Sequence, residues 1–213
     1  MARAGGRGVF SGIETRSPRW QRVIDKNLDL AEAAARIRAA GAHGIKTTVS
    51  LITGFPEETL DDLRQTADLL MDSVRFDHTV PQLHLLAPLA GTPIHQRHRD
   101  ELVLDHVLSD ISCHGWRLDP ADRSLIAAHP EIFPNFYAPP TPWLDRAYLK
   151  ELHDFIMNGI VRFRWLLIGL HQAAGVLDVF EAWRGWRKNG DPAYYSRIAF
   201  RRDFLEFVRG LAS

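Results

Sequence analysis

The stretch Ile45-Lys-Thr-Thr-Val-Ser-Leu-Ile-Thr-Gly-Phe-Pro-Glu-Glu-Thr59 carries the clearest structural signal in this chain. Its β-branched first half predicts a strand over 43–52. A glycine–phenylalanine–proline turn follows, and Thr59 with Asp62 three residues later predicts a capping box at the start of a helix. The stretch therefore predicts a strand that leads through a short turn into an amphipathic helix.

The segments on either side continue this alternation. An apolar, glycine-bounded strand is predicted over 8–13 and another β-rich strand over 80–87. Helical patterns are predicted over 19–24 and over 28–40, with Gly41 as the carboxyl-terminal cap of the second helix. Strands and helices that alternate with short links predict an α/β fold with a parallel sheet.

The character of the chain changes near residue 92, where strand signals stop and Trp, Phe, Leu and Arg dominate. The proline-rich region 116–142 predicts a short helix between irregular segments. Thr141-Pro142 is typical of a helix start and predicts a long helix to about His171. Two further helices are predicted over 176–188 and 192–210. These patterns divide the chain into an α/β part over 1–100 and a helical part over 101–213.

Composition excludes several classes of protein. The 213 residues carry 26 Lys+Arg against 26 Asp+Glu, which argues against binding to nucleic acid or acidic membranes by bulk charge. The apolar segment 160–170 contains two arginines and is too short to span a bilayer. The amino terminus lacks the apolar run of a secretory signal, so the cytoplasm is the expected location. The single cysteine, Cys113, excludes an internal disulfide.

The two faces of the predicted strands differ in polarity. Strands 45–52 and 80–87 are each apolar on one face and mixed on the other, whereas a strand buried between two helix layers is apolar on both. We therefore expect a curved sheet with a helix-covered outer face and an inner face that lines a ligand cavity. Gln82 and His84 lie on the mixed face and are candidate substrate contacts, and Glu14 ends the first strand.

Three separated segments resemble one enzyme family. Gly12-Ile-Glu-Thr15 followed by Asp25-Lys26 resembles the "GxES…K" segment on the fourth barrel strand of radical S-adenosylmethionine enzymes. The segment 50–59 is similar to the "GFPGET" segment after the fifth strand, and Pro88-Leu-Ala-Gly-Thr-Pro93 to the "PLPGTP" turn after the sixth. The style is that of the subgroup with an upstream cobalamin-binding domain. The resemblance covers about residues 3–100.

The resemblance implies the fold and a cofactor site. The fold would be half of a partial (β/α)6 barrel, with three parallel strands and their helices over 1–100 and an all-helical carboxyl-terminal extension over 101–213. Ligands of parallel β/α folds bind at the carboxyl ends of the strands. The family holds the methionine and ribose of S-adenosylmethionine after the fourth strand, and adenine after the fifth and sixth. The implied cofactor-binding residues here are Glu14, Thr15, Ser50 (where the family has glycine), Ile52, Gly54, Glu57 or Glu58, and the backbone at Leu86.

The resemblance also implies a missing part. The family binds a 4Fe-4S cluster through Cys-x3-Cys-x2-Cys after its first strand, and this chain contains neither that motif nor those strands. We therefore interpret the chain as a carboxyl-terminal fragment of such an enzyme, inactive alone. A partner polypeptide would supply the cluster-binding half-barrel, with a small-molecule substrate and cobalamin as a candidate cofactor. The alternative is a non-catalytic remnant or a helical scaffold subunit.

Other groups of residues support weaker hypotheses. His95 and His98 have near-helical spacing and are candidate metal ligands, but solvated side chains are the favoured interpretation. Cys113-His114 is a candidate nucleophile pair, against a buried thiol. The arginine-rich region 184–209 is a candidate nucleic-acid or partner surface, against the favoured packed amphipathic helix. No catalytic residue or metal ligand is assigned, and neither a membrane nor a nucleic acid is expected as a partner.

Overall fold

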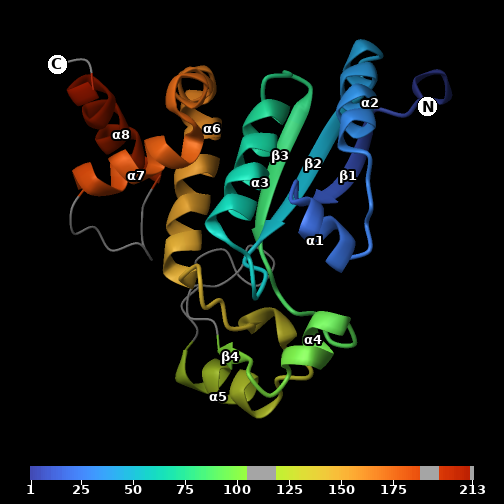
Figure 1. The fold of residues 1–213 in the computed structure, drawn as a ribbon, viewed down its shortest axis with the longest axis vertical. Helices are drawn as coiled ribbons and strands as arrows, with labels where there is room; N and C mark the ends of the chain where they lie inside the picture. Colours follow the sequence, from blue (N-terminus) through green and yellow to red (C-terminus); the bar gives the residue numbers. More distant parts are fainter. Residues whose placement is uncertain (105–118, 188–196, 212–213) are drawn as a thin grey trace.

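A three-stranded parallel sheet forms the centre of the molecule (Figure 1). The structure is a computed structural model, and it describes residues 1–104, 119–187 and 197–211. The sheet order is β1 (Gly8–Glu14), β2 (Lys46–Thr53) and β3 (Thr79–Leu85), with both pairings parallel. The predicted α/β class and parallel strands are confirmed. A partial barrel is not, because these strands form an open sheet.

Helices connect the strands along one face of the sheet. The connection from β1 to β2 contains α1 (Pro18–Val23) and α2 (Leu30–Ala42), and α3 (Leu60–Ser73) leads from β2 to β3. The predicted capping box is present, because the Thr59 side chain accepts from the Asp62 backbone and Asp62 accepts from the Thr59 backbone. The strand–turn–helix prediction from 45–59 is therefore confirmed.

The predicted cap at Gly41 is wrong. The α2 helix continues to Ala42, and His43 is its carboxyl-terminal cap. A Cβ atom at Gly41 would lie 2.0 Å from the His78 ring, whose Nε2 atom is 2.9 Å from the Ile37 carbonyl oxygen. Glycine is thus required here because an imidazole packs against the helix backbone.

A layer of three helices lies beside β3 and α3 (Figure 1). These are α6 (Arg146–Ala174), α7 (Val176–Arg187) and α8 (Arg197–Leu211). The predicted start of α6 at Thr141-Pro142 is wrong, since Asp145 caps the helix by accepting from the Ala147 backbone. Non-helical backbone at Phe163 kinks α6 in its middle.

One continuous hydrophobic core joins this helical layer to the sheet. Val49, Leu51 and Leu83 on the covered face of the sheet belong to the same buried cluster as the aromatic side chains of the helices. Those aromatic side chains, each at most 1 % exposed, are Phe155, Phe180, Trp183, Phe200 and Phe204. Burial of large aromatic surfaces stabilises the packing of all three helices against the sheet.

A small lobe lies at the carboxyl end of the sheet (Figure 1). It contains α4 (Pro93–His98), β4 (Val103–Leu104), α5 (Pro120–Ala128), the 3-10 helix Pro134–Phe136 and β5 (Tyr137–Ala138). A second 3-10 helix, Ala2–Ala4, lies at the amino terminus, away from this lobe. The strands β4 and β5 pair antiparallel, so the expectation of an all-helical extension is wrong in this detail. Their pairing joins residues far apart in sequence, which local strand patterns do not reveal.

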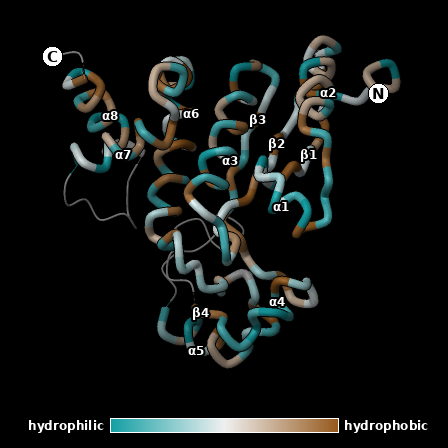
Figure 2. Tube along the Cα trace, viewed as in Figure 1, coloured by the Kyte–Doolittle hydropathy of each residue, from teal (hydrophilic) through white to brown (hydrophobic). Residues whose placement is uncertain are grey.

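Within the described ranges, no single helix has both the length and the apolarity needed to cross a membrane. The pair α6 and α7 reaches those limits only when taken together, and it is bent by 103°. Hydrophobic and hydrophilic residues alternate along both helices rather than forming a uniform apolar segment (Figure 2). Most of their large apolar side chains belong to the core described above.

Candidate functional site

The sheet has one open face, and the strand register places its residues in rows. One row contains Phe10, Thr48 and Val80, and the next contains Gly12, Ser50 and Gln82. On the opposite face Val49, Leu51 and Leu83 are at most 1 % exposed, whereas on this face Phe10 is 64 % and Val80 46 % exposed. The predicted difference between a helix-covered face and a mixed face is therefore confirmed, and the cavity remains a prediction.

An ion pair lies on this open face where β1 ends. The Nζ atom of Lys26 is 3.2 Å from Oε1 of Glu14 and donates to the Gly12 carbonyl at 2.9 Å. A Cβ atom at Gly12 would lie 2.5 Å from the same Glu14 oxygen, so the carboxylate covers the glycine. Gly12 thus provides the space that the Glu14–Lys26 pair occupies.

Backbone strain is concentrated around this pair. Glu14, Asp25 and Asn27 have φ angles of 69°, 53° and 46°, and they are the non-glycine residues with positive φ in the described chain. This region of backbone conformation is disfavoured for residues that carry a Cβ atom, and such strain is concentrated at functional sites. The strained segments are those that place Glu14 and Lys26 together.

The structure separates Thr15 from Glu14. Thr15 is completely buried, and its hydroxyl bonds to the Thr66 hydroxyl at 2.9 Å and accepts from the Ser17 backbone. Its side chain therefore joins the end of β1 to α3, on the covered side of the sheet. Its predicted contact with a cofactor is untested, and its visible role is to fix the loop that carries Glu14.

Gly54 and Leu86 lie together at the carboxyl ends of β2 and β3. The Leu86 N–H donates to the Thr53 carbonyl at 2.8 Å. A Cβ atom at Gly54, whose φ is +89°, would lie 3.0 Å from Nη1 of Arg146 and 3.7 Å from the Leu86 nitrogen. The backbone at Gly54 is thus approached closely by both the next strand and the start of α6.

A buried carboxylate holds the loop after β2. Glu58 is 1 % exposed and accepts hydrogen bonds from the Thr53 hydroxyl at 2.6 Å and the Gly54 N–H at 2.5 Å. Burial raises its pKa to about 7 although these hydrogen bonds lower it. The side chain of Glu57 is 70 % exposed and lies 3.8 Å from Arg19. Of the two candidates, Glu58 fixes this loop.

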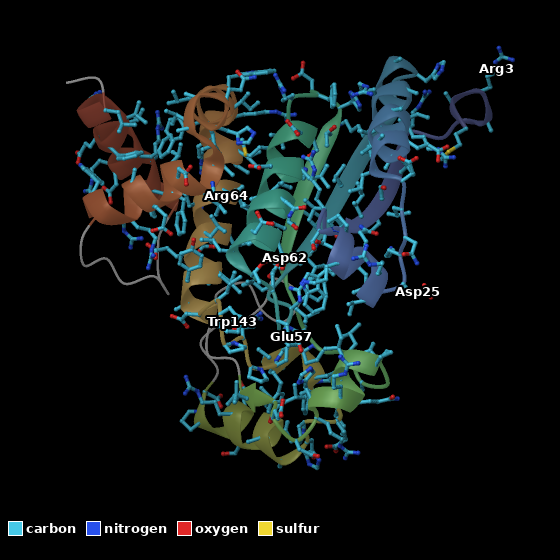
Figure 3. The ribbon with its side chains drawn as sticks, in the orientation of Figure 1. Arg3, Asp25, Glu57, Asp62, Arg64 and Trp143 are labelled. Carbon is cyan, nitrogen blue, oxygen red and sulfur yellow. The ribbon has the colours of Figure 1, made fainter. Side chains whose placement is uncertain are left out.

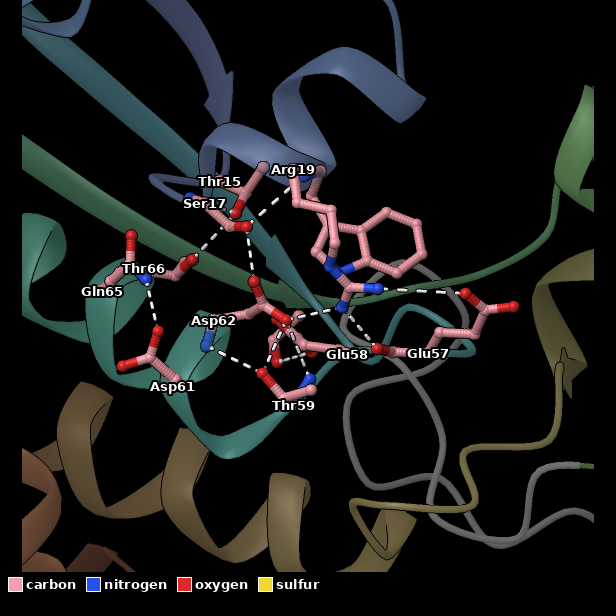
Figure 4. A network of polar contacts seen from close by, with 12 residues as sticks. Thr15, Ser17, Arg19, Glu57, Glu58, Thr59, Asp61, Asp62, Gln65 and Thr66 are labelled. Atoms are coloured by element: carbon pink, nitrogen blue, oxygen red, sulfur yellow. Dashed lines mark hydrogen bonds and ion pairs between the residues drawn. The ribbon is translucent and has the colours of Figure 1, made fainter.

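A network of polar contacts joins the loop after β1 to the start of α3 (Figure 4). Asp62 accepts from the Ser17 hydroxyl at 2.5 Å and from Arg19 at 2.6 Å, in addition to its capping box with Thr59. Burial would raise the pKa of Asp62, but these hydrogen bonds outweigh it and lower the pKa to about 2. The network therefore holds the carboxyl ends of β1 and β2 at a fixed separation.

Sequence reasoning missed the first-strand side of this network. Ser17 caps α1 and Gln21 donates to the carbonyls of Ile13 and Thr15, so both fix the β1–α1 loop. The Ser17-Pro18 pair is a helix-start signal that could have been recognised. The Arg19 guanidinium lies 5.1 Å from the centre of the Trp20 ring, which stacks on Phe55 at 4.6 Å. The stacking of Trp20 on Phe55 joins α1 to the loop after β2, so no local sequence signal predicts it.

The remaining site candidates lie on the open face beside these groups. Gln82 and His84 are hydrogen-bonded to each other at 3.2 Å and pair in register with Ser50 and Ile52. Ser50 is buried at 4 % exposure, and Ile52 packs against the Trp20–Phe55–Leu86 cluster. Their functions stay predictions, but the structure brings them within one region of the sheet.

The structure bears on two of the three weaker hypotheses, the metal site at His95 and His98 and the arginine-rich surface. No group of three or more His, Cys, Asp or Glu in the described part of the chain is arranged to hold a metal ion, and His98 bonds to Glu101 at 2.9 Å. Cys113 and His114 lie outside the described residues. Arg184 and Arg187 pair with Glu151 at 2.9 and 3.2 Å, which favours the packed-helix interpretation of that region.

Comparison with known proteins adds a limited result. No protein-family model matches the chain. A curated protein of Pyrococcus horikoshii, described as an uncharacterized methyltransferase, is 28 % identical over 92 residues, which is 43 % of this chain. The match covers 19 % of that protein, so the matched part of this chain spans about a fifth of its length. The chain is thus similar in part to a methyltransferase.

Proposed function

We propose that this chain forms the S-adenosylmethionine-binding side of a methyltransferase of the radical S-adenosylmethionine type. The partial similarity to a methyltransferase supports the cofactor class. The resemblance of the segments ending at Thr15, Thr59 and Pro93 supports the radical type. In this proposal residues 1–100 bind the cofactor and residues 101–213 are the extension that packs on them.

One observation carries the proposal. Three separated segments meet at the carboxyl edge of one parallel sheet: the Glu14–Lys26 pair, the Gly54 backbone and the Leu86 backbone. Figure 3 shows Glu57 and Asp62 at the same end of the sheet, where it faces the small lobe. Ligands of parallel sheets bind at this edge.

The residues present fit the chemical groups of S-adenosylmethionine. Its amino acid part carries an ammonium and a carboxylate, for which Glu14 and Lys26 provide the complementary charges. Its adenine requires an apolar contact and close backbone approach, which Ile52 and Gly54 offer. When bound, this cofactor supplies the methyl group or the adenosyl fragment for the reaction. The chain's own residues orient the cofactor. The Asp62 network holds the loops after β1 and β2 at a fixed separation.

The chain does not fit the 4Fe-4S cluster of the family. A single cysteine cannot supply three thiolate ligands. In the proposal the cluster, and cobalamin if the enzyme uses it, are held by another polypeptide segment. This same observation favours the second candidate function, a non-catalytic scaffold subunit. Binding of the cofactor distinguishes the two candidates.

Calorimetric titration with S-adenosylhomocysteine tests the proposal. We expect saturable binding that is lost in Gly54→Ala, because the added methyl group would lie 3.0 Å from the Arg146 guanidinium, on a backbone whose φ of +89° disfavours a Cβ atom. Gly91→Ala is the matched control, since Gly91 also has positive φ (84°) but nothing lies within 4 Å of its Cβ position. No binding by the wild-type chain, or equal losses in both variants, would contradict the proposal and favour the scaffold.

A further inference from the structure

Glu58 is a buried carboxyl group whose two oxygen atoms have different surroundings. Its Oε2 atom accepts hydrogen bonds from the Thr53 hydroxyl and the Gly54 N–H, and the residue is 1 % exposed. Its Oε1 atom is also buried but has no hydrogen-bond partner in the part of the chain that the structure describes. A buried carboxylate is costly unless it is paired and fully hydrogen-bonded. The fold therefore leaves a buried oxygen atom that can carry either a proton or a negative charge.

The charged and titratable groups around Glu58 leave its charge uncompensated. Those on the neighbouring elements are Arg19 of α1, Asp62 of α3, His84 of β3, Arg146 of α6, the Glu14–Lys26 pair after β1, and Glu57 in the same loop. Arg19 donates to Asp62 at 2.6 Å (Figure 4). Burial raises the pKa of Glu58 to about 7, and the negative charge of Asp62 adds to this effect. A positive charge that a ligand brings near Glu58 would favour the ionised carboxylate.

The same carboxyl group fixes the backbone that the proposed function places against adenine. Gly54 donates its N–H to Oε2 of Glu58, and its Cβ position lies 3.7 Å from the Leu86 nitrogen. S-adenosylmethionine carries a positive charge on its sulfur atom, and S-adenosylhomocysteine lacks this charge. At about 10 Å, a separation similar to the length of the adenosyl group, a unit charge changes the ionisation equilibrium of a partly buried carboxyl group roughly tenfold. The two ligands should therefore differ in their effect on Glu58.

We propose that Glu58 provides the counter-charge for the sulfonium group of S-adenosylmethionine and releases its proton to solvent when this cofactor binds. S-adenosylhomocysteine leaves the proton on Glu58, because it brings no positive charge. Glu58 thereby favours the charged cofactor over its demethylated product, and this preference grows as pH rises and the carboxylate becomes easier to form. This role rests on the proposed function, because it requires the cofactor to bind beside Gly54.

Calorimetric titration with both ligands at pH 5.5 and pH 8 tests this role. In the wild type we expect the ratio of the two affinities, S-adenosylmethionine over S-adenosylhomocysteine, to rise roughly tenfold between these pH values. Glu58→Gln keeps an acceptor for Thr53 and Gly54 and should show no such rise. Glu57→Gln is the matched control, since Glu57 is 70 % exposed in the same loop and should behave as the wild type. The ligands' amino groups and His84 titrate in all three proteins, so their contributions cancel. A constant ratio in the wild type, or an equal rise in Glu58→Gln, would overturn the proposal.

Counting protons in the wild type provides a second test that needs no variant. Titrations at pH 6.5 in two buffers of different ionisation enthalpy give the number of protons released on binding. A tenfold change lowers the pKa of Glu58 from about 7 to about 6, so we expect about half a proton to leave per S-adenosylmethionine bound and none with S-adenosylhomocysteine. Equal proton counts for the two ligands contradict the proposal and leave the proposed function intact. Binding of neither ligand contradicts the proposed function itself.

Discussion

Glu58 is a buried carboxylate whose protonation makes the stability of the loop after β2 depend on pH. Its Oε2 atom holds Thr53 and Gly54, while its Oε1 atom is buried without a hydrogen-bond partner among the described residues. Desolvation therefore dominates and raises the pKa of this carboxyl group from 4.5 to about 7. The folded chain binds a proton that the unfolded chain releases between these two values.

This protonation predicts a specific pH dependence of stability. Because the folded state holds more protons, the free energy of unfolding should fall as pH rises from about 4.5 to 7, by about 3 kcal/mol in total. Glu58→Gln keeps both accepted hydrogen bonds without a charge, so it should remove this slope. Urea unfolding at pH 5 and pH 8 measures the difference. An equal slope in both proteins would contradict the role assigned to Glu58.

Asp62 is the opposite case, because its hydrogen bonds favour the charged form. Asp62→Ala removes the partner of Ser17 and Arg19 together with the capping box, and we expect it to destabilise the fold by about 2 kcal/mol or more. The stability that Asp62 contributes in the wild type should disappear as pH falls from about 4 to 2. Asp61→Ala is the control, since Asp61 is exposed and accepts a hydrogen bond from the Gln65 side chain within α3. Equal chemical denaturation midpoints for the two variants would argue against the network.

At the scale of elements, local sequence signals predicted much of the fold. The strands β1, β2 and β3 and the helix α3 were predicted because β-branched runs, turn residues and the Thr59–Asp62 box act over a few residues. The start of α6 was not, because Leu144 is buried in the core and Asp145, not Thr141, provides the cap. Tertiary packing here overrode a local signal.

The candidate site was predictable to a smaller extent. Glu14, Ile52, Gly54 and Leu86 were selected by resemblance, and the structure places them near one sheet edge. The burial of Thr15 and the choice of Glu58 over Glu57 could not be predicted. Both depend on which side of the strand end faces α3, and that follows from contacts such as Thr15–Thr66 between distant segments.

Gly41 gives a prediction about helix packing. Gly41→Ala would place a methyl group 2.0 Å from the His78 ring, so we expect destabilisation of about 1–3 kcal/mol despite the better helix propensity of alanine. Gly185→Ala in α7 meets nothing within 4 Å and should stabilise the chain by up to about 1 kcal/mol. Thermal unfolding of the two variants should shift in opposite directions. A shift in the same direction would show that the His78 ring can move aside without destabilising the fold.

At the scale of the whole molecule, the sheet organises the candidate site. Its carboxyl edge gathers the Glu14–Lys26 pair and the backbones of Gly54 and Leu86. The helical layer and the sheet share one core, so the carboxyl-terminal helices support the sheet from the side opposite β1.

Amide hydrogen exchange with and without S-adenosylhomocysteine tests the central idea most directly. If the adenosyl group lies across the strand ends, protection should increase together in the segments 12–15, 52–55 and 86–88 and nowhere in α5 or α7. Protection confined to the small lobe, or no change at a saturating concentration of the compound, would contradict the account.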